Sequence, residues 1–358
     1  MSSLPTEAMP VHTKAAPDER VFLYARRADV NDATSFYIDT IAGVLRGSGR
    51  QLIHTDDVRN IPWRADVLVV NCKVAIMIHL LRPRSKVWLW LQGIVPEETE
   101  LHMGSTIRKM YWTIFERVAL PRANGIFMVS EAMRTHYANK YKFSNLPTFI
   151  MPCVNQELNA ESFVSPMKYS QMRFAYAGSL HKWQCIDETL DSYSLIKKRF
   201  PSASLTFLTS DRAKATEMIE SRKLQDVEVE YCKPSELQGV LAGFKYGFAL
   251  RQAHPVNTVA TPTKVSSYMA AGVIPILTTA VSDFTVRLSG VSPMVMLEEP
   301  DPQLVLDGVC RIEANSLDPT AVFHSYVKVF EEYFDLQRYS GAIQAFFRET
   351  GMAVNEHV

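Results

Sequence analysis

Short apolar runs alternate with helical segments along most of the chain, and this alternation limits the fold more than any other feature. The runs are rich in β-branched and aromatic residues, as in strands that are buried on both faces. We expect strands at 21–25, 52–54, 67–71, 87–91, 125–129 and 149–151, and again at 174–177, 205–208, 227–231, 246–250, 273–277 and 294–297. Helices between the strands would cover both faces of each sheet, so the sequence predicts parallel sheets of the α/β class.

The alternation is interrupted once, near residues 152–171, where prolines and asparagines indicate an irregular linker. A chain of 358 residues is long enough for two domains. We therefore expect a disordered N-terminus at 1–20, a first domain at 21–165, a second domain at 166–336 and a C-terminal helix at 337–358. Open sheets of this kind bind ligands at the carboxyl ends of their strands, so the crevice between the domains is the expected site.

Composition excludes several classes of protein. Lys plus Arg and Asp plus Glu number 38 each, and no basic tail is present, so a nucleic-acid partner is not expected. The five cysteines are scattered without a CxxC pair, which indicates neither a zinc site nor a disulfide framework. No run is long and apolar enough for a membrane span or a signal peptide, and we expect a cytoplasmic protein.

The stretch 246–278 predicts an anion site, because it reads strand, polar loop, short helix and strand, with the helix ending at Gly272. In such a βαβ unit the free N–H groups of Thr263 and Lys264 point at the crevice, with the helix dipole behind them. Arg251 and Lys264 add mobile positive charge, which favours a diphosphate. The alternative is a βαβ unit of the core that binds no ligand, since helix N-termini are common. The candidate residues are Arg251, Thr261 as the N-cap, Thr263 and Lys264.

Several segments, in their order along the chain, resemble the retaining glycosyltransferases of family 4, which have the GT-B fold. The segments are WLQGIVPEE, ANGIFMVSEAMRTHY, MPCVN, FAYAGSLHKW and TPTKVSSYMAAGVIPIL. The resemblance implies two Rossmann-like, doubly wound domains that face each other across a cleft, the first for the acceptor and the second for the nucleotide sugar. It also implies transfer of a hexosyl or deoxyhexosyl unit from a nucleoside-diphosphate donor to a glycan or lipid-linked acceptor, in the synthesis of cell-surface polysaccharide.

In the second domain, the resemblance places the family's Gly-x-Leu loop at Gly178 and Ser179, with Lys182 as the lysine that meets the diphosphate. Family members also carry two glutamates separated by seven residues, and the equivalent positions here are Val259 and Ser267. Ser267 is kept as a candidate for the ribose because of its place on the helix. The missing glutamates leave a second function open, namely a non-catalytic protein that binds a sugar nucleotide or a glycan on the same fold.

The candidates in the first domain follow the strand that ends at Leu91. Gln92 stands where the family often has a histidine, and Glu97 and Glu98 follow in an expected loop near the acceptor. Either glutamate would serve as a general base if the reaction inverts, or both are simply the acids of an N-terminal turn. No pair of acids occupies a metal position, so we expect neither a metal ion nor a cofactor, and basic side chains would neutralise the leaving diphosphate.

The segment 105–120 predicts an amphipathic helix with two open interpretations. Its apolar residues are Ile107, Met110, Tyr111, Ile114 and Phe115, and its basic residues include Arg108, Lys109 and Arg117. The simpler interpretation is that the apolar side packs against the core. The other is peripheral contact with the inner face of a membrane or with a lipid-linked acceptor. For the segment 337–358, the resemblance implies a helix that crosses back to the first domain.

Overall fold

The structure is a computed structural model that describes residues 19–26, 32–143, 145–165 and 167–354. The expectation of disorder at 1–20 falls almost entirely outside these residues. Within the described chain, the first domain forms one parallel sheet in the order β2-β1-β3-β4-β5-β6. Its strands are β1 (Arg20–Tyr24), β2 (Gln51–Thr55), β3 (Asp66–Val69), β4 (Lys86–Trp90), β5 (Gly125–Met128) and β6 (Thr148–Ile150).

The second domain forms another parallel sheet, with the strand order β12-β11-β10-β7-β8-β9. Its strands are β7 (Arg173–Ala177), β8 (Ser204–Leu208), β9 (Val227–Glu230), β10 (Tyr246–Ala249), β11 (Ile274–Thr278) and β12 (Val295–Leu297). The expected strands are thus confirmed in both domains, with ends displaced by one or two residues. In the second sheet the order in which successive strands are added reverses between β7 and β10, and a crevice opens at such a switch point.

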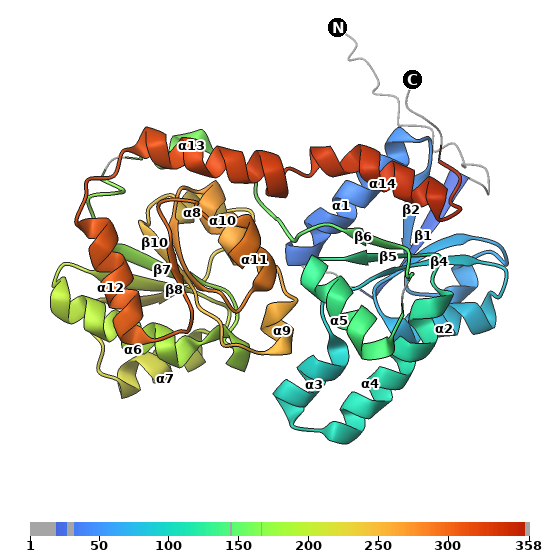
Figure 1. The fold of residues 1–358 in the computed structure, drawn as a ribbon, viewed down its shortest axis with the longest axis horizontal. Coiled ribbons are helices and arrows are strands. Elements are labelled where there is room, and N and C mark those ends of the chain that lie inside the picture. The colour runs from blue at the N-terminus through green and yellow to red at the C-terminus, as the bar shows by residue number, and fades with distance from the viewer. Residues whose placement is uncertain (1–18, 27–31, 144, 166, 355–358) are drawn as a thin grey trace, which may run out of the picture.

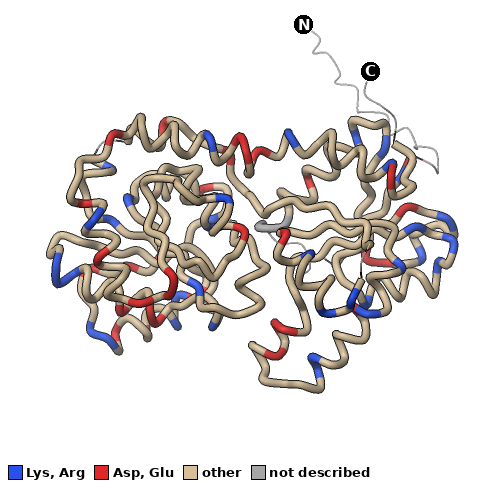
Figure 2. Tube along the Cα trace, in the orientation of Figure 1, with Lys and Arg blue, Asp and Glu red and all other residues tan. Residues whose placement is uncertain are grey.

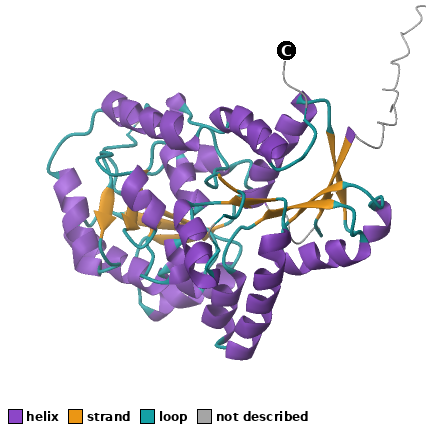
Figure 3. Ribbon diagram, turned by 45° about the vertical axis from the view of Figure 1, so that its right-hand side comes forward, coloured by secondary structure: helices purple, strands orange, loops and turns teal. Residues whose placement is uncertain are grey.

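Helices cover both faces of each sheet, as Figure 3 shows. Those of the first domain are α1 (Asp32–Gly47), α2 (Cys72–Leu81), α3 (Val95–Met103), α4 (Thr106–Ala119) and α5 (Glu131–Tyr141). The expected loop at α3 is wrong, because Pro96 occupies the first turn of a helix, where its missing N–H is not needed. Glu97 and Glu98 follow in that turn, where the helix dipole favours acids. Helix α2 was not predicted.

The helices of the second domain continue into a long C-terminal arm. They are α6 (Ile186–Arg199), α7 (Arg212–Ser221), α8 (Leu237–Leu241), α9 (Pro255–Thr258), α10 (Thr263–Ala270), α11 (Ser282–Arg287), α12 (Pro302–Glu313), α13 (Pro319–Val329) and α14 (Gln337–Glu349). The short helices α9 and α11 were not predicted, because one turn carries too little periodicity to detect. Among the described helices, none is both long and apolar enough to cross a membrane.

The inner strands of the first sheet are mainly apolar because both of their faces are covered. On β4, Trp88 and Trp90 face the layer of α1 and α14, whereas Val87 and Leu89 face the layer of α2 and α5. These side chains are completely buried. Trp90 stacks on Tyr37 of α1 with 4.5 Å between the ring centroids. The alternation of faces along β4 therefore accounts for its uninterrupted apolar sequence.

The chain crosses between the domains twice, once in the segment that links β6 to β7 and once between α13 and α14 (Figure 1). After the second crossing, α14 packs on the first domain, where Phe346 and Phe347 contact Phe127 of β5 at 5.3 and 5.5 Å between ring centroids. The two crossings lie side by side, because Leu158 of one and Leu336 of the other line the same cavity of about 570 Å³.

A second set of contacts joins the domains across the cleft. Ser130, the N-cap of α5, donates its hydroxyl to the carbonyl of Val259 at 2.6 Å. The Asp283 carboxylate of α11 accepts the backbone N–H groups of Glu131 and Ala132, both at 3.3 Å. The second domain thus supplies an acid to the positive end of a helix of the first domain. These bonds hold the carboxyl ends of the two sheets close together.

Candidate functional site

The loops after β7 and β10 meet at the switch point of the second sheet. Gly178 follows β7 with φ +134°, a backbone conformation that favours glycine. A Cβ atom at this position would lie 3.3 Å from Nζ of Lys264. The glycine therefore lets the loop approach the lysine closely. Arg251 follows β10 directly, so the topology brings these candidate residues together at one edge of the sheet.

Helix α10 aims its first turn at this edge, although its start differs from the expectation by one residue. Pro262 occupies the N-cap position, and the helix begins at Thr263 with no side-chain cap among the described residues. Thr261 is therefore not the cap, and its hydroxyl accepts the N–H of Cys153 at 3.1 Å. The helix ends as expected at Gly272, which has φ +68°. The first-turn N–H groups remain suited to an anion.

Arg251 and Lys264 are buried cations without a carboxylate partner. They are only 5% and 9% exposed. The Lys264 ammonium donates to Oε1 of Gln184 at 2.8 Å and lies 4.0 Å from the ring centroid of Tyr176. Arg251 donates to the carbonyl of Trp183 at 2.9 Å, and its Nε has no hydrogen-bond partner. The expectation of mobile charge is wrong, because both side chains are packed and held.

The electrostatics of this pair reflect the missing counter-charge. Burial lowers the pKa of Arg251 to about 10. Burial, together with the positive charge of Arg251, lowers the pKa of Lys264 well below its usual value. Within the described chain, no carboxylate contributes to either shift. Because burying an unpaired charge is unfavourable, two neighbouring cations in one crevice make it suited to an anion.

The remaining second-domain candidates divide into two groups. Lys182 is exposed beside the crevice, in the short turn 182–184, and Ser179 lies in the loop after Gly178. Ser267, in contrast, is almost completely buried, and its hydroxyl donates to Oδ1 of Asn155 at 2.7 Å. Thr261 and Ser267 thus fasten α10 to the linker between the domains. Gln184 and Tyr176 complete the surroundings of Lys264, and no sequence signal marked either of them.

The candidates of the first domain are engaged in other contacts. Glu98 accepts the N–H of Ile94 at 3.2 Å and thereby caps the start of α3. Glu97 is buried and pairs with Lys140 at 2.8 Å and with His136 at 3.5 Å. Burial opposes its ionisation, but the bonds from His136 and Lys140 outweigh this and lower the pKa of Glu97 to about 2. So weak a base does not suit proton abstraction.

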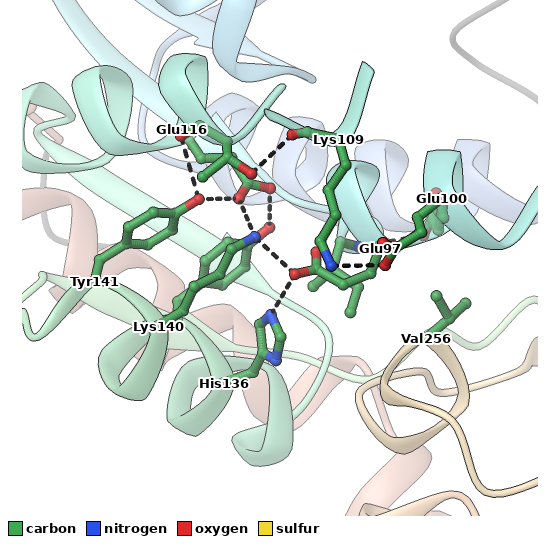
Figure 4. Close-up of polar contacts among 12 residues, drawn as sticks. Glu97, Glu100, Lys109, Glu116, His136, Lys140, Tyr141 and Val256 are labelled. Atoms are coloured by element: carbon green, nitrogen blue, oxygen red, sulfur yellow. Dashed lines mark hydrogen bonds and ion pairs between the residues drawn. The ribbon is translucent and has the colours of Figure 1, made fainter. Parts of the chain in front are cut away.

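Glu97 belongs to a polar network that joins α3, α4 and α5 (Figure 4). Lys140 bridges Glu97 and Glu116, and its bond to Glu116 is 3.0 Å long. Glu116 also accepts the hydroxyl groups of Tyr137 at 3.0 Å and Tyr141 at 2.5 Å. The network holds the α3–α4 hairpin on the domain, so its acids have a structural role. Gln92, by contrast, is half-buried at the carboxyl end of β4 and stays a candidate.

Open space remains between the domains beside these contacts. A cavity of about 630 Å³ lies between α5 and the segment around α9, and its lining includes His136 of the first domain and His254 of the second. Across the cleft, His102 of α3 approaches His181 and Trp183 at 5.9 and 6.4 Å between ring centroids. The cleft is therefore lined by both domains, with its basic edge on the second.

The fold is that of known glycosyltransferases. Neither a protein-family model nor a curated protein sequence matches the chain. Sucrose-phosphate synthase from Thermosynechococcus elongatus superimposes with a TM-score of 0.72 at 12% identity, over 92% of this chain and 98% of that one. Anabaena HepE in complex with UDP-glucose gives a TM-score of 0.68 at 10% identity, over 92% and 99% of the two chains.

A third solved structure is longer than this chain. TarM of S. aureus, in complex with UDP and α-GlcNAc-glycerol among other ligands, gives a TM-score of 0.63 at 12% identity. The match covers 82% of this chain but only 57% of TarM. At such identities these likenesses concern the fold alone. They confirm the GT-B architecture expected from the sequence, with two Rossmann-like domains around a cleft.

Proposed function

We propose that the protein is a glycosyltransferase that moves a sugar from a nucleoside-diphosphate donor to a hydroxyl group of a glycan or lipid-linked acceptor. One observation carries the proposal: at the switch point of the second domain, Arg251 and Lys264 are buried with no counter-ion among the residues that the structure describes. On a GT-B fold, a diphosphate in this crevice supplies the missing negative charge. The N-terminus of α10 points at the same place and adds N–H donors.

In the proposed reaction, the bond between the sugar's anomeric carbon and the diphosphate oxygen breaks while the acceptor hydroxyl oxygen bonds to that carbon, and the hydroxyl proton passes to the departing diphosphate oxygen. Negative charge then grows on the leaving diphosphate. Arg251 and Lys264 stabilise this charge with donors that are already in position, and Lys182 is free to add a third cation from the rim. With three cations available, the proposal needs neither a metal ion nor a cofactor.

The acceptor would enter from the first domain. The cavity of about 630 Å³ between α5 and α9 offers it room, and Gln92 lies at the carboxyl end of β4. Glu97 is held by Lys140 and is a poor base, which favours retention over a general-base inversion. Transfer of a hexosyl or deoxyhexosyl unit and a role in cell-surface polysaccharide synthesis stay predictions from the resemblance, and a place at the inner membrane face stays a prediction from the helix at 105–120.

The second candidate function, a non-catalytic binder of a sugar nucleotide or glycan, has its own supporting observation. Val259 occupies one of the two family glutamate positions, and its side chain packs into the apolar cluster of the first domain. The other position is Ser267, which bonds to Asn155 instead of facing the crevice. Val259 and Ser267 thus make contacts within the protein, so a donor nucleotide sugar would lack the contacts that the two glutamates of the family provide.

One set of measurements separates the two functions. Titration calorimetry with UDP and GDP tests binding, and a panel of UDP- and GDP-sugars with glycan and lipid-linked acceptors tests release of the nucleotide. The transferase releases nucleotide only when an acceptor is present, also with EDTA, and gives a product whose anomeric configuration matches the donor. Binding without release supports the non-catalytic protein. If neither nucleotide binds, both functions are wrong.

A further inference from the structure

Helix α4 presents its apolar side to solvent instead of to the core. Ile107, Met110 and Ile114 are 78%, 61% and 57% exposed. Together with exposed Tyr111 they follow the spacing of three and four residues that places side chains on one side of a helix. The interpretation that this side packs against the core is wrong. The core is contacted by the opposite side, which carries the buried carboxylate of Glu116.

The exposed apolar surface continues from α4 onto neighbouring parts of the first domain. Helices α2 and α4 pack together, and His79 of α2 lies 3.1 Å from the carbonyl of Arg122. Arg82, just after α2, donates to the carbonyl of Ile61 at 2.8 Å and so joins the loop that carries Trp63. We call the combined surface the docking face. It comprises Trp63, Leu80, Leu81, Met103, Ile107, Met110, Tyr111 and Ile114.

The docking face holds every large exposed hydrophobic side chain among the described residues of the first domain. In the linker and the second domain, such residues occur singly or in pairs, as at Val286 and Leu304. Exposed apolar side chains gathered on neighbouring elements of one domain indicate an interaction site rather than the usual scatter. The hairpin of α3 and α4 also projects from the domain, as Figures 1 and 3 show, so the face is convex.

The charge around the docking face is positive. Between residues 72 and 122 the chain has eight Lys or Arg residues and four Glu residues. The four carboxylates are turned inward or paired: Glu97 and Glu116 are buried in the network with Lys140, Glu98 caps α3, and Glu100 pairs with Lys109. Several basic residues of this segment lie on α4 or on the elements beside it, and Figure 2 marks Lys and Arg positions along the part of the chain that carries α2 and α4. Lys86, by contrast, donates to the carbonyl of Gly351.

We propose that the docking face binds the surface of a bilayer that contains anionic lipids. Apolar side chains on one side of a helix with arginines on its flanks match an interface in which acyl chains lie below charged headgroups. Arg108 and Arg117 stand on opposite flanks of the stripe and are exposed. A second copy of the chain is a poorer occupant, because two-fold pairing of the face would bring these like charges together.

The docking face lies near the cleft between the domains, so binding to a bilayer would place the cleft beside the membrane surface. Helix α3 begins at Ile94, immediately after the loop that ends β4, and its other end brings His102 to the cleft-side ring of His181. A bilayer against the hairpin therefore lies beside the cleft. If the proposed transfer is correct, on which this step rests, the acceptor class that fits best is one with a lipid anchor.

The test is co-sedimentation with phosphatidylcholine vesicles made with and without phosphatidylglycerol. The full chain is expected to bind only the anionic vesicles. The double variant Ile107→Ser/Ile114→Ser should bind them at least about tenfold more weakly, because the apolar contact is lost. The variant Arg108→Glu/Arg117→Glu should lose the dependence on phosphatidylglycerol. The matched control Val286→Ser/Leu304→Ser removes two exposed apolar side chains from the second domain and should bind like the unaltered chain.

Several results would overturn the proposal. One is that the unaltered chain does not co-sediment with anionic vesicles. Another is that the Ile107→Ser/Ile114→Ser variant binds these vesicles as strongly as the unaltered chain does. A dimer in solution that Ile107→Ser/Ile114→Ser dissociates would assign the face to a second copy. Calorimetry with UDP and GDP in lipid-free buffer keeps the two proposals apart: a chain that binds vesicles but neither nucleotide refutes the proposed function alone. The serine variant should bind UDP normally, which also shows that it is folded.

Discussion

Helices α10 and α4 both depart from the rule that charge lies outside and apolar side chains lie inside, and they do so in different ways. Every residue of α10 from Lys264 to Ala270 is buried, including the lysine and two serines. Helix α4 buries Glu116 and exposes Ile107, Met110 and Ile114. The charge inside α4 is balanced by Lys140, whereas the charge inside α10 has no acid beside it.

The comparison shows that the partners of a buried charge distinguish a structural role from a role in ligand binding. Glu116 receives a cation and two tyrosine hydroxyl groups from the protein itself, so its charge is balanced and its role is structural. Lys264 receives only a neutral amide and an aromatic ring. A buried charge with its partners present stabilises the fold, and one without them is suited to a ligand that brings the counter-charge.

The largest effect is expected at Glu116. Removing one member of a buried ionic network leaves its partners buried without their counter-charge. Glu116→Ala should therefore lower the free energy of unfolding by about 3 kcal/mol or more. Urea denaturation measures this. The neighbouring exposed Arg117→Ala should change it by less than about 0.5 kcal/mol. A loss below about 1 kcal/mol for Glu116→Ala would mean that the network does not hold α4.

Lys264→Met should act on the ligand instead of the fold. If the ammonium meets the diphosphate, UDP binding should weaken by about 1–3 kcal/mol, while the unliganded protein stays at least as stable because a desolvated charge is gone. Calorimetry and urea denaturation measure the two quantities on the same sample. Lys198→Met, on the exposed far end of α6, is the matched control. An unchanged UDP affinity would remove Lys264 from the site.

The pH dependence of UDP binding should reveal the same lysine. Its pKa lies well below the usual value because of burial and Arg251, so it loses its proton at a lower pH than an ordinary lysine does. A diphosphate favours the charged form. UDP affinity should therefore fall as the pH rises through this lowered pKa, by up to about tenfold per unit, with proton uptake on binding at pH values above it. Lys264→Met should flatten the profile, and a profile shared by both proteins would contradict the assignment.

The smallest effect is expected on the outer side of α4. Ile114→Ser should change the free energy of unfolding by less than about 0.5 kcal/mol, because the side chain already meets water. Val265→Ala, on the buried side of α10, should lower it by about 2 kcal/mol. The same denaturation experiment compares the two. A large loss for Ile114→Ser would show that α4 packs its apolar side against the protein in solution.

The strands were predictable from sequence because parallel sheets covered on both faces require uninterrupted apolar runs. The same is true of Gly272, since a helix end with positive φ favours glycine. Helix α4 was predicted as a helix but placed with the wrong side inward, because periodicity shows that one side is apolar and not what covers it. The exposure of that side comes from Glu116 and its distant partners on α5.

The candidate site was predictable to the extent that it follows from chain order. The topology alone brings the residues just after β7 and β10 together at the switch point, independently of side-chain contacts. Gly178 and Arg251 were therefore predicted correctly as neighbours. The contacts made by Gln184 and Tyr176 depend on tertiary packing across 80 or more residues and leave no local signal. Glu97 shows the opposite error, because an acid near a cleft was assigned to chemistry before its partner Lys140 was known.

The paired crossings of the chain have a mechanical consequence. Two covalent strands that run side by side along one edge behave as a hinge with a fixed axis, and a single flexible tether would permit swivelling as well. Opening the cleft then reduces to one angle, and the edge where His102 approaches His181 travels farthest, whereas Asp283 stays beside the hinge because its neighbour Phe284 packs on Tyr333 and Phe334 (Figure 1). A single distance between two labels at that edge would therefore report the complete movement of one half of the molecule against the other.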